Sequence, residues 1–291
     1  MDFEDLKTFI TLSEFKNFTK TAEQLHLVQS TVSNRIKKVE DSVGKKLFIR
    51  NNKTVVLTNT GKLFLKYAKR LTDIHSTAIS ELHALETFED ILNIGSVHSI
   101  YDSRLHELVF RYVCNCNSIS TNIIIGHSNE LFQKLHDNIL DIAFTYYKIN
   151  SSKLLNIPYK KDELILTTSP VNNTFIDGIS NNDLKKLPII YSNIILSSTS
   201  NFPHEIFSDN YIFQLHINIL SEVIPFLEKG IGYCFLPRSL VNSKLDNGKL
   251  IEIKLLEMDP PVLQSYMIVN KKKLNSTAVV KWFDCNFPEL L

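Results

Sequence analysis

An amphipathic helix is encoded by the stretch Val28-Gln29-Ser30-Thr31-Val32-Ser33-Asn34-Arg35-Ile36-Lys37-Lys38-Val39-Glu40. Val32, Ile36 and Val39 are spaced at i, i+4 and i+7, the spacing of one apolar helix face. Gly44 follows shortly after and predicts the end of the helix. The opposite face carries short polar and basic side chains, namely Ser30, Asn34 and Lys37, flanked by Thr31, Ser33 and Lys38.

Two shorter helices are expected before this one. Apolar residues from Phe3 to about Glu14 recur with the helical period, and Asn17 is a good N-cap for a second helix. Two short helices separated by a tight turn, the later one exposing hydroxyls and an amide near its start, match the geometry that enters a DNA major groove. The alternative is an ordinary three-helix bundle whose polar face only meets solvent.

A β-hairpin is expected directly downstream. The β-prone runs Lys45–Arg50 and Lys53–Thr58 are joined by a pair of asparagines, which favour a turn. Arg50 and Lys53 would then lie at the hairpin tip, where a cation can reach the sugar-phosphate backbone of DNA.

Charge is distributed unevenly along the 291 residues. Residues 1–70 contain 14 Lys and Arg against 7 Asp and Glu, whereas the remainder contains 18 against 24. The chain as a whole has a formal net charge of only +1. A basic N-terminal part beside an acidic remainder indicates that the N-terminal part faces nucleic acid.

These residues carry a family resemblance that runs from Leu6 through Leu71. The matching positions are Phe18-Thr19, Ala22-Glu23-Gln24-Leu25, Gln29-Ser30, Val32-Ser33, Ile36, Glu40, Gly44, Leu47-Phe48, Arg50, Leu57-Thr58 and Gly61. In this pattern the chain resembles the LysR-type transcriptional regulators. Two positions depart from the family: Val28 stands where Ser or Thr is common, and Asn34 where Arg is frequent.

The resemblance implies an α/β protein in three parts. Residues 1–59 would form a winged helix-turn-helix DNA-binding domain and residues 60–89 a long dimerising linker helix. Residues 90–291 would form a two-lobed effector-binding domain like a periplasmic binding protein. Lobe I would comprise about 90–160 and 267–291, and lobe II about 161–266.

The candidate DNA-contacting residues follow from the helix faces and the hairpin. We expect Ser30, Ser33 and Asn34 to read base edges of double-stranded DNA. The remaining candidates would mostly contact the DNA backbone, and they are Gln29, Thr31, Arg35, Lys37, Lys38, Arg50 and Lys53.

A long helix is expected from Thr60 to about Glu86. Its apolar positions repeat with alternating spacings of four and three residues, and they are Phe64, Ala68, Leu71, His75, Ala78, Leu82 and Leu85. Such a heptad seam needs a partner to bury it, and a second copy of the chain, in a homodimer or a tetramer, is the simplest one. The alternative is packing of the seam against the chain's own second domain.

Strands alternate with helices after Glu89. Expected strands include Ile91–Gly95, Asn122–Gly126, Asp141–Thr145 and Glu163–Thr167. This alternation predicts βαβ units, a mainly parallel sheet and two α/β lobes. The strand Ser265–Val269 and a helix over 277–287 would return to lobe I, as in the family.

Ligands of open α/β sheets bind at the carboxyl ends of strands, beside helix N-termini that attract anions. The polar residues at those places are Ser96, His98 and Ser99 after one strand, His127 and Ser128 after the next, and Ser197, Ser198 and Thr199 as an opposite wall. The pattern predicts a small anionic metabolite as effector. Each of these assignments has its own alternative. Ser99 and Ser128 could serve only as helix caps, and residues 197–199 could be a plain surface loop. His98 and His127 could instead hold a metal.

Other function classes lack support in the sequence. The motifs of P-loop, zinc-protease and serine-hydrolase sites are missing, so we expect no enzyme, no cofactor and no metal. The acidic N-terminus and the lack of a long apolar run predict a cytoplasmic protein without membrane contact. The four cysteines are expected to be reduced core thiols.

Two alternative functions stay open from the sequence alone. One is a cytosolic small-molecule-binding protein or enzyme whose N-terminal helices serve assembly. The other is a thiol-redox regulator, although no cysteine lies between Cys116 and Cys234, where the redox sensors of the family carry theirs.

Overall fold

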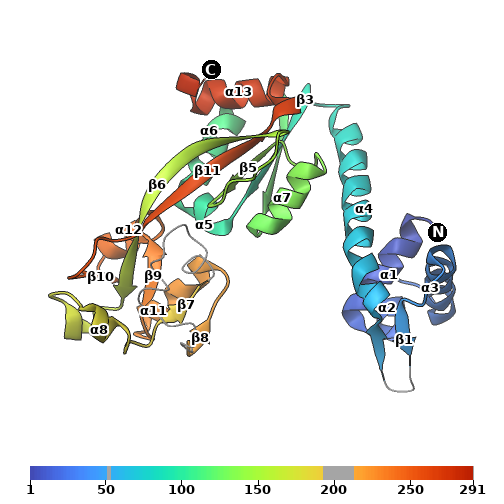
Figure 1. The fold of residues 1–291 in the computed structure, drawn as a ribbon. Helices are drawn as coiled ribbons and strands as arrows, with labels where there is room; N and C mark the ends of the chain where they lie inside the picture. Colours follow the sequence, from blue (N-terminus) through green and yellow to red (C-terminus); the bar gives the residue numbers. More distant parts are fainter. Residues whose placement is uncertain (51–53, 193–212, 291) are drawn as a thin grey trace. The chain divides into compact units, whose positions relative to one another are not determined.

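The computed structural model describes residues 1–50, 54–192 and 213–290. The chain divides into two compact units, residues 1–86 and 87–291 (Figure 1). Within the described ranges, none of the helices is both long and apolar enough to span a membrane.

The first unit has the expected order of helices and hairpin. It contains α1 (Phe3–Phe15), α2 (Phe18–Gln24), α3 (Gln29–Val43), β1 (Phe48–Arg50), β2 (Val55–Leu57) and α4 (Asn59–Ala84). The predicted caps are confirmed: the Asn17 side chain accepts a hydrogen bond from the amide of Lys20 at 3.0 Å, and Gly44 ends α3 with φ of 70°.

Helices α1, α3 and α4 share one core with the hairpin. Phe9, Ile36 and Leu47 are each 0% exposed. Gly61, in the first turn of α4, lies so close to β1 that a Cβ there would sit 2.1 Å from the carbonyl oxygen of Leu47. Only glycine permits this approach, which sets the long helix against the base of the hairpin.

A buried carboxylate connects α3 to the hairpin. Glu40 is 3% exposed and accepts hydrogen bonds from the amides of Leu47 at 2.9 Å and Phe48 at 3.3 Å. Its other oxygen lies 2.7 Å from Lys46 Nζ. Burial by itself would raise the pKa of Glu40, but these hydrogen bonds outweigh it and hold the pKa below its ordinary value.

The second unit is built on a mixed sheet whose order is β10-β6-β11-β5-β3-β4, with β9 also paired to β6. Its strands are β3 (Asp90–Ser96), β4 (Ile119–Ile125), β5 (Ile142–Thr145), β6 (Leu154–Thr168), β9 (Cys234–Pro237), β10 (Ile251–Ile253) and β11 (Val262–Asn270). Strand β3 is parallel to β4 and β5, whereas β6 and β11 pair antiparallel. A short parallel pair, β7 (Ile190–Tyr191) and β8 (Leu215–His216), lies apart.

The second unit also contains helices and short turns. They are α5 (His98–Ile100), the π-helix Tyr101–Leu105, α6 (His106–Asn115), α7 (Ser128–His136), α8 (Asn181–Leu184), α11 (Ile224–Glu228), α12 (Arg238–Asp246) and α13 (Thr277–Asn286), with 3₁₀ turns at 173–175, 220–223, 271–273 and 288–290. Helices α6 and α13 pack on one face, around Phe144 and Trp282. Helix α7 packs on the other face, beside Ala143.

The expectation of a mainly parallel sheet is wrong. The predicted strand at 163–167 is the end of the longer β6, which begins at Leu154 and passes through the charged run Lys160–Asp162. Strands β6 and β11 connect two separate cores, one around Leu92 and Trp282 and one around Leu166 and Phe235. We call the parts around these cores lobe I and lobe II.

Replacement of Glu40 tests how much the buried carboxylate stabilises the first unit. We expect Glu40→Gln to lower the free energy of unfolding of the first unit by about 1–3 kcal/mol at pH 7, because buried amides lose a charged acceptor. A lowered pKa means that the stabilisation is present above pH 4.5 and is lost as the pH falls through the value in the folded protein. The variant should therefore lose less stability than the parent on acidification.

Denaturation followed by circular dichroism measures this effect, while the fluorescence of Trp282, the chain's one tryptophan, reports lobe I separately. Lys46→Met is the matched control, because Lys46 is 75% exposed and an exposed ion pair contributes less than about 1 kcal/mol. Equal losses in the two variants would contradict the role given to Glu40.

Candidate DNA-binding surface and ligand cleft

Helix α3 presents a polar face that its apolar face holds in place. Val32, Ile36 and Val39 are fully buried. On the other side, Gln29, Ser30, Asn34, Lys37 and Lys38 are exposed, and Thr31 and Ser33 are half-buried. Asp41, one turn beyond Lys37, is also exposed and adds a negative charge to this face. The surface suited to an anionic polymer is therefore confined to the first turns of α3.

The N-terminus of α3 lacks a side-chain cap. Val28 occupies the N-cap position in extended conformation, is 66% exposed and offers no oxygen to the amides of the first turn. Unpaired amides at the positive end of a helix are donors suited to a phosphate group.

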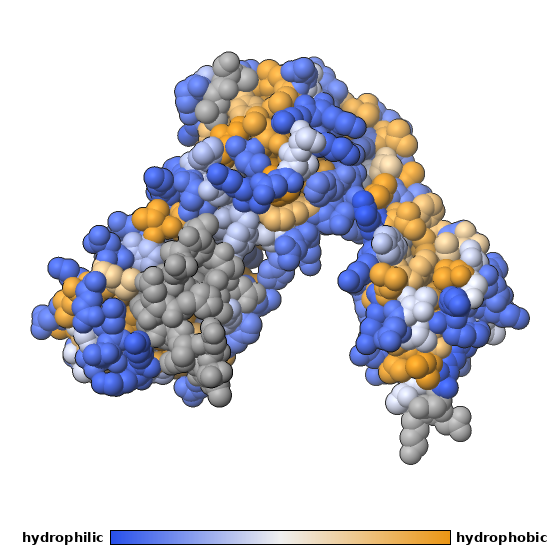
Figure 2. All heavy atoms as spheres, viewed as in Figure 1, coloured by the Kyte–Doolittle hydropathy of each residue, from blue (hydrophilic) through white to orange (hydrophobic). Residues whose placement is uncertain are grey.

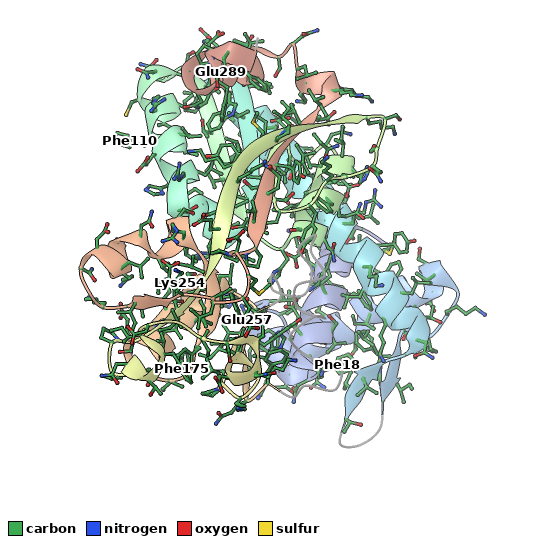
Figure 3. The ribbon with its side chains drawn as sticks, turned by 60° about the vertical axis from the view of Figure 1, so that its left-hand side comes forward. Phe18, Phe110, Phe175, Lys254, Glu257 and Glu289 are labelled. Carbon is green, nitrogen blue, oxygen red and sulfur yellow. The ribbon has the colours of Figure 1, made fainter. Side chains whose placement is uncertain are left out.

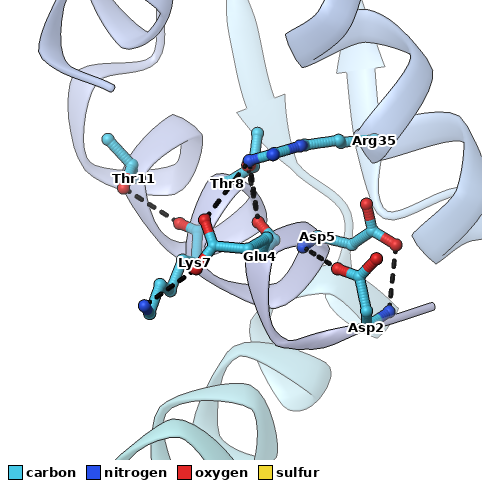
Figure 4. A network of polar contacts seen from close by, with 7 residues as sticks. All are labelled: Asp2, Glu4, Asp5, Lys7, Thr8, Thr11 and Arg35. Carbon is cyan, nitrogen blue, oxygen red and sulfur yellow. Dashed lines mark hydrogen bonds and ion pairs between the residues drawn. The ribbon is translucent and has the colours of Figure 1, made fainter. Parts of the chain in front are cut away.

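Arg35 points away from this polar face. Its guanidinium lies 3.5 Å from the carboxylate of Glu4 and donates a hydrogen bond to the hydroxyl of Thr8 at 3.2 Å (Figure 4). These contacts join α3 to α1, so the side chain is occupied within the protein. The contact of Arg35 with DNA stays a prediction.

The hairpin carries an exposed arginine. The guanidinium of Arg50 lies 4.6 Å from the centre of the Phe18 ring, at the start of α2, an arrangement that fixes the cation beside the helices. Lys53 lies outside the described residues.

The predicted seam combines residues from two different faces of α4. Ala68 is 0% exposed and Phe64 packs on the same core, while the His75 ring stacks on Phe3 at 3.8 Å between centroids. These three residues face their own unit, which corrects their assignment to a dimer seam. Of the other predicted seam residues, Leu71, Ala78, Leu82 and Leu85 are exposed.

A different apolar stripe remains exposed along α4. It consists of Leu63, Tyr67, Leu71, Ile74, Ala78, Leu82 and Leu85, which repeat every three or four residues. Hydrophobic atoms follow the length of this helix in Figure 2. We call this set the α4 stripe.

A cleft of about 1170 Å³ opens in the second unit at the carboxyl ends of β3 and β4. Its lining combines aromatic, apolar and polar side chains, which are Val97, His98, Ser99, Ile125, Gly126, His127, Ser128, Asn129, Glu130, Phe132, Tyr146, Tyr147, Tyr191, Asn218, Ile219 and Leu220.

Two histidines on the lobe I side of the cleft contact residues near the start of the 220–223 turn. His98 Nδ1 lies 3.2 Å from the hydroxyl of Ser221 and 2.8 Å from a carboxylate oxygen of Asp102. His127 Nε2 lies 3.4 Å from the amide nitrogen of Asn218. Both imidazoles are therefore placed where the two walls of the cleft meet.

The predicted serines have different surroundings. Ser96 is 0% exposed and donates to the carbonyl of Val97, so its side chain does not reach the cleft. Ser99 lines the cleft but shares a 2.9 Å hydrogen bond with the buried hydroxyl of Tyr146. The alternative that Ser99 only caps its helix is wrong, because Val97 is the N-cap of α5.

Ser128 is the first residue of α7 rather than its cap, and the N-cap position belongs to His127. Ser128 lines the cleft and is half-buried, so its hydroxyl is available there. Ser197, Ser198 and Thr199 lie outside the described residues.

The cleft carries few fixed charges. Among its described lining residues there is no lysine or arginine, and Glu130 is the only carboxylate. Glu130 also accepts a hydrogen bond from the amide of His127 at 3.4 Å, at the N-terminus of α7. Burial raises the pKa of Tyr146, which keeps that hydroxyl neutral. In the part of the chain that is described, no three acidic, histidine or cysteine side chains gather where an ion could be held.

Several lining residues were not predicted. Tyr146 and Tyr147 come directly after the predicted strand Asp141–Thr145, at the carboxyl end of a third parallel strand, and this position could have identified them. Phe132 and Asn218 carry no comparable local signal.

Comparison with known proteins gives two sequence matches that together span most of the chain. A profile described as "Bacterial regulatory helix-turn-helix protein, lysR family" matches residues 3–62, and one described as "LysR substrate binding domain" matches residues 86–286. The HTH-type transcriptional regulator CitR of Bacillus subtilis is 29% identical over 287 residues, covering 94% of this chain and 96% of that protein. The HTH-type transcriptional activator IlvY of Haemophilus influenzae is 55% identical over 69 residues, 24% of each chain.

Solved structures show the same fold at low sequence identity. The structure of CbnR, described as a LysR family transcriptional regulator, has a TM-score of 0.73 at 16% identity and covers 98% of this chain and 97% of that one. Full-length CbnR complexed with its target DNA has a TM-score of 0.71 at 15% identity, with 98% of both chains covered.

Proposed function

The chain belongs to the LysR family of bacterial transcriptional regulators, and we propose from this premise how it reads DNA and which effector it takes. It is a DNA-binding regulator with an effector-binding domain, not an enzyme. The observation that carries the proposal is the exposed polar face of α3, whose opposite face is locked into the core.

Base recognition is assigned to the first turns of α3. Ser30 and Asn34 are exposed on this face and are short enough to let the helix approach base edges. Ser33 flanks them. Lys37, Lys38 and the first-turn amides left uncapped by Val28 contact phosphates, together with Arg50 on the hairpin. The structure of CbnR with its target DNA shows that a protein of this fold binds DNA.

Self-association is assigned to the α4 stripe. An apolar stripe that runs along a helix and faces solvent needs a partner, and a second copy of the helix offers a matching one. Two-fold symmetry would then present two α3 helices to two half-sites of an operator. Since the target is chromosomal DNA, the protein would work in the cytoplasm.

The effector is assigned to the cleft between the lobes. Two imidazoles and the Ser128 hydroxyl can bind one anionic group, whereas the absence of lysine and arginine from the described lining disfavours a polyanion. Tyr147, Phe132 and Ile219 provide apolar contact for the rest of the molecule. We therefore assign a small metabolite with a single carboxylate-like group and an apolar body.

Effector binding would act through the closure of the lobes. Contacts of His98 with Ser221 and of His127 with Asn218 already cross the cleft, so a ligand that joins or replaces them favours one degree of closure. Such a ligand changes operator binding only through its differential affinity for the two states. A change of closure would alter the spacing of the paired DNA-binding domains and the bend of the operator.

Footprinting of the purified protein on genomic DNA, followed by binding to selected and random duplexes, tests the DNA-binding surface. We expect Asn34→Ala to relax the base preference, with a loss of about 1–3 kcal/mol of discrimination. Lys37→Ala should weaken binding to all sequences alike and reduce the slope of affinity against salt concentration. If Asn34→Ala keeps the specificity profile of the parent, the base contact is assigned wrongly.

A charge in the α4 stripe tests self-association. We expect Leu82→Glu to convert the assembly to monomers, because Leu82 is 63% exposed and an unpaired carboxylate would be buried in the contact. Sedimentation velocity measures the change. Glu86→Lys is the control, since Glu86 is exposed beyond the stripe and should leave the assembly intact. Dimers of Leu82→Glu with the parent's affinity would place the contact elsewhere.

Thermal shift with mono-, di- and tricarboxylates tests the cleft. We expect monocarboxylates with apolar bodies to stabilise the second unit, and His127→Ala to weaken that binding roughly tenfold through loss of a charged hydrogen bond. His26→Ala, at an exposed histidine of the first unit, is the control and should behave like the parent. Tightest binding by a tricarboxylate would contradict the assigned effector class.

A further inference from the structure

Two cysteines from distant parts of the sequence lie side by side in lobe I. Cys116 is the C-cap of α6, and Cys285 lies in the last turn of α13. Their sulfur atoms are 3.7 Å apart. The two helices pack on the same face of the sheet (Figure 1), so a bond between these sulfurs would join the C-terminal helix to the middle of the chain.

The surrounding contacts hold this pair in register. The Tyr112 hydroxyl, one turn before Cys116, donates a hydrogen bond to the carbonyl of Ala278 on α13 at 2.8 Å. The rings of Tyr112 and Trp282 pack with 5.3 Å between centroids. Because the two helices are fixed to each other by these contacts, the two sulfurs are held close to each other.

We propose that Cys116 and Cys285 form a reversible disulfide when the protein meets a hydroperoxide. A disulfide requires a separation of about 2.05 Å, so the sulfurs must approach by roughly 1.7 Å. Small rotations of the two side chains supply this movement, because both cysteines lie at helix ends rather than in helix centres.

The two thiols have different environments, which sets the order of the steps. Cys116 is 7% exposed, and burial together with the hydrogen bond to Cys285 raises its pKa. Cys285 is half-buried and therefore more accessible to a peroxide. Because access to the sulfur governs its oxidation, Cys285 reacts first and Cys116 second.

In the first step, the Cys285 thiolate attacks one oxygen of hydrogen peroxide. An S–O bond forms, the O–O bond breaks, and the hydroxide that leaves takes up a proton to become water. The sulfur is now a sulfenic acid, oxidised by two electrons.

In the second step, the Cys116 thiolate attacks the Cys285 sulfur. The S–S bond forms, the S–O bond breaks, and a second hydroxide leaves as water. Two thiols and one peroxide thus give one disulfide and two waters, and two molecules of an external thiol reverse the reaction by exchange.

Exposure to solvent distinguishes Cys114 from this pair of cysteines. Cys114 lies two residues before Cys116 but is exposed, which corrects the expectation that all four cysteines are core thiols. It provides a control for non-specific oxidation. Phe110, four residues earlier on α6, also points outward and is 72% exposed (Figure 3).

The test treats the reduced full-length protein with hydrogen peroxide, blocks free thiols and analyses the digested peptides by mass spectrometry. We expect a peptide linked through Cys116 and Cys285, which a dithiol releases. Its rate of formation should rise with pH, because the thiolate is the nucleophile. Oxidation should also raise the melting temperature reported by Trp282 by roughly 5 °C.

Three variants separate the steps. Cys114→Ser should form the same linked peptide at the rate of the parent. Cys116→Ser should stop at a sulfenic acid on Cys285 that dimedone traps, and Cys285→Ser should slow oxidation at Cys116 at least about tenfold. A parent protein that gives no 116–285 peptide, or one that links Cys114 instead, would overturn the proposal without bearing on DNA or effector binding.

Discussion

The hydrogen bonds to the Glu40 carboxylate hold α3 against the hairpin. A carboxylate is costly to bury unless donors surround it, and here two backbone amides and a lysine supply them. The amides belong to Leu47 and Phe48, so the carboxylate fixes where β1 starts relative to the end of α3. Gly61 then brings α4 against the carbonyl of Leu47. The positions of α3, the hairpin and the long helix therefore depend on this small group of contacts.

Most of the first unit could be predicted because its signals are local. Periodicity located α1, α3 and α4, and a capping asparagine and a terminal glycine marked two helix boundaries. The partners of individual side chains are harder to predict. Arg35 is cationic and near the polar face, and the sequence does not show that it pairs with Glu4 on α1. In α4, Phe64 and Leu71 fit one heptad pattern, but Phe64 packs on the core of the unit whereas Leu71 is exposed to solvent. Sequence spacing cannot resolve adjacent faces of one helix.

The second unit was predictable in its alternation but not in its pairing. Strand β6 passes through the charged run Lys160–Asp162, and its antiparallel partner β11 lies about a hundred residues later, so no local pattern shows the ladder. The residues that line the cleft also divide into those with a local sequence signal and those without one. His98, His127 and Ser128 were found because ligands gather at strand ends, whereas Asn218 reaches the cleft only through tertiary folding. Ser96 and Ser99 do lie at the carboxyl end of β3, as predicted, but their hydroxyls form hydrogen bonds with Val97 and Tyr146.

The two lobes have separate cores, and the antiparallel pair β6 and β11 passes from one to the other. The register of that pair shifts between Gln264 and Tyr266, and the Ser265 hydroxyl fills the irregularity by contacting the backbone of Lys160. A bulge of this kind bends the strand locally. The thiol pair lies within lobe I, on α6 and α13. A disulfide there would stiffen the lobe that supplies both histidines of the cleft without linking that lobe covalently to lobe II.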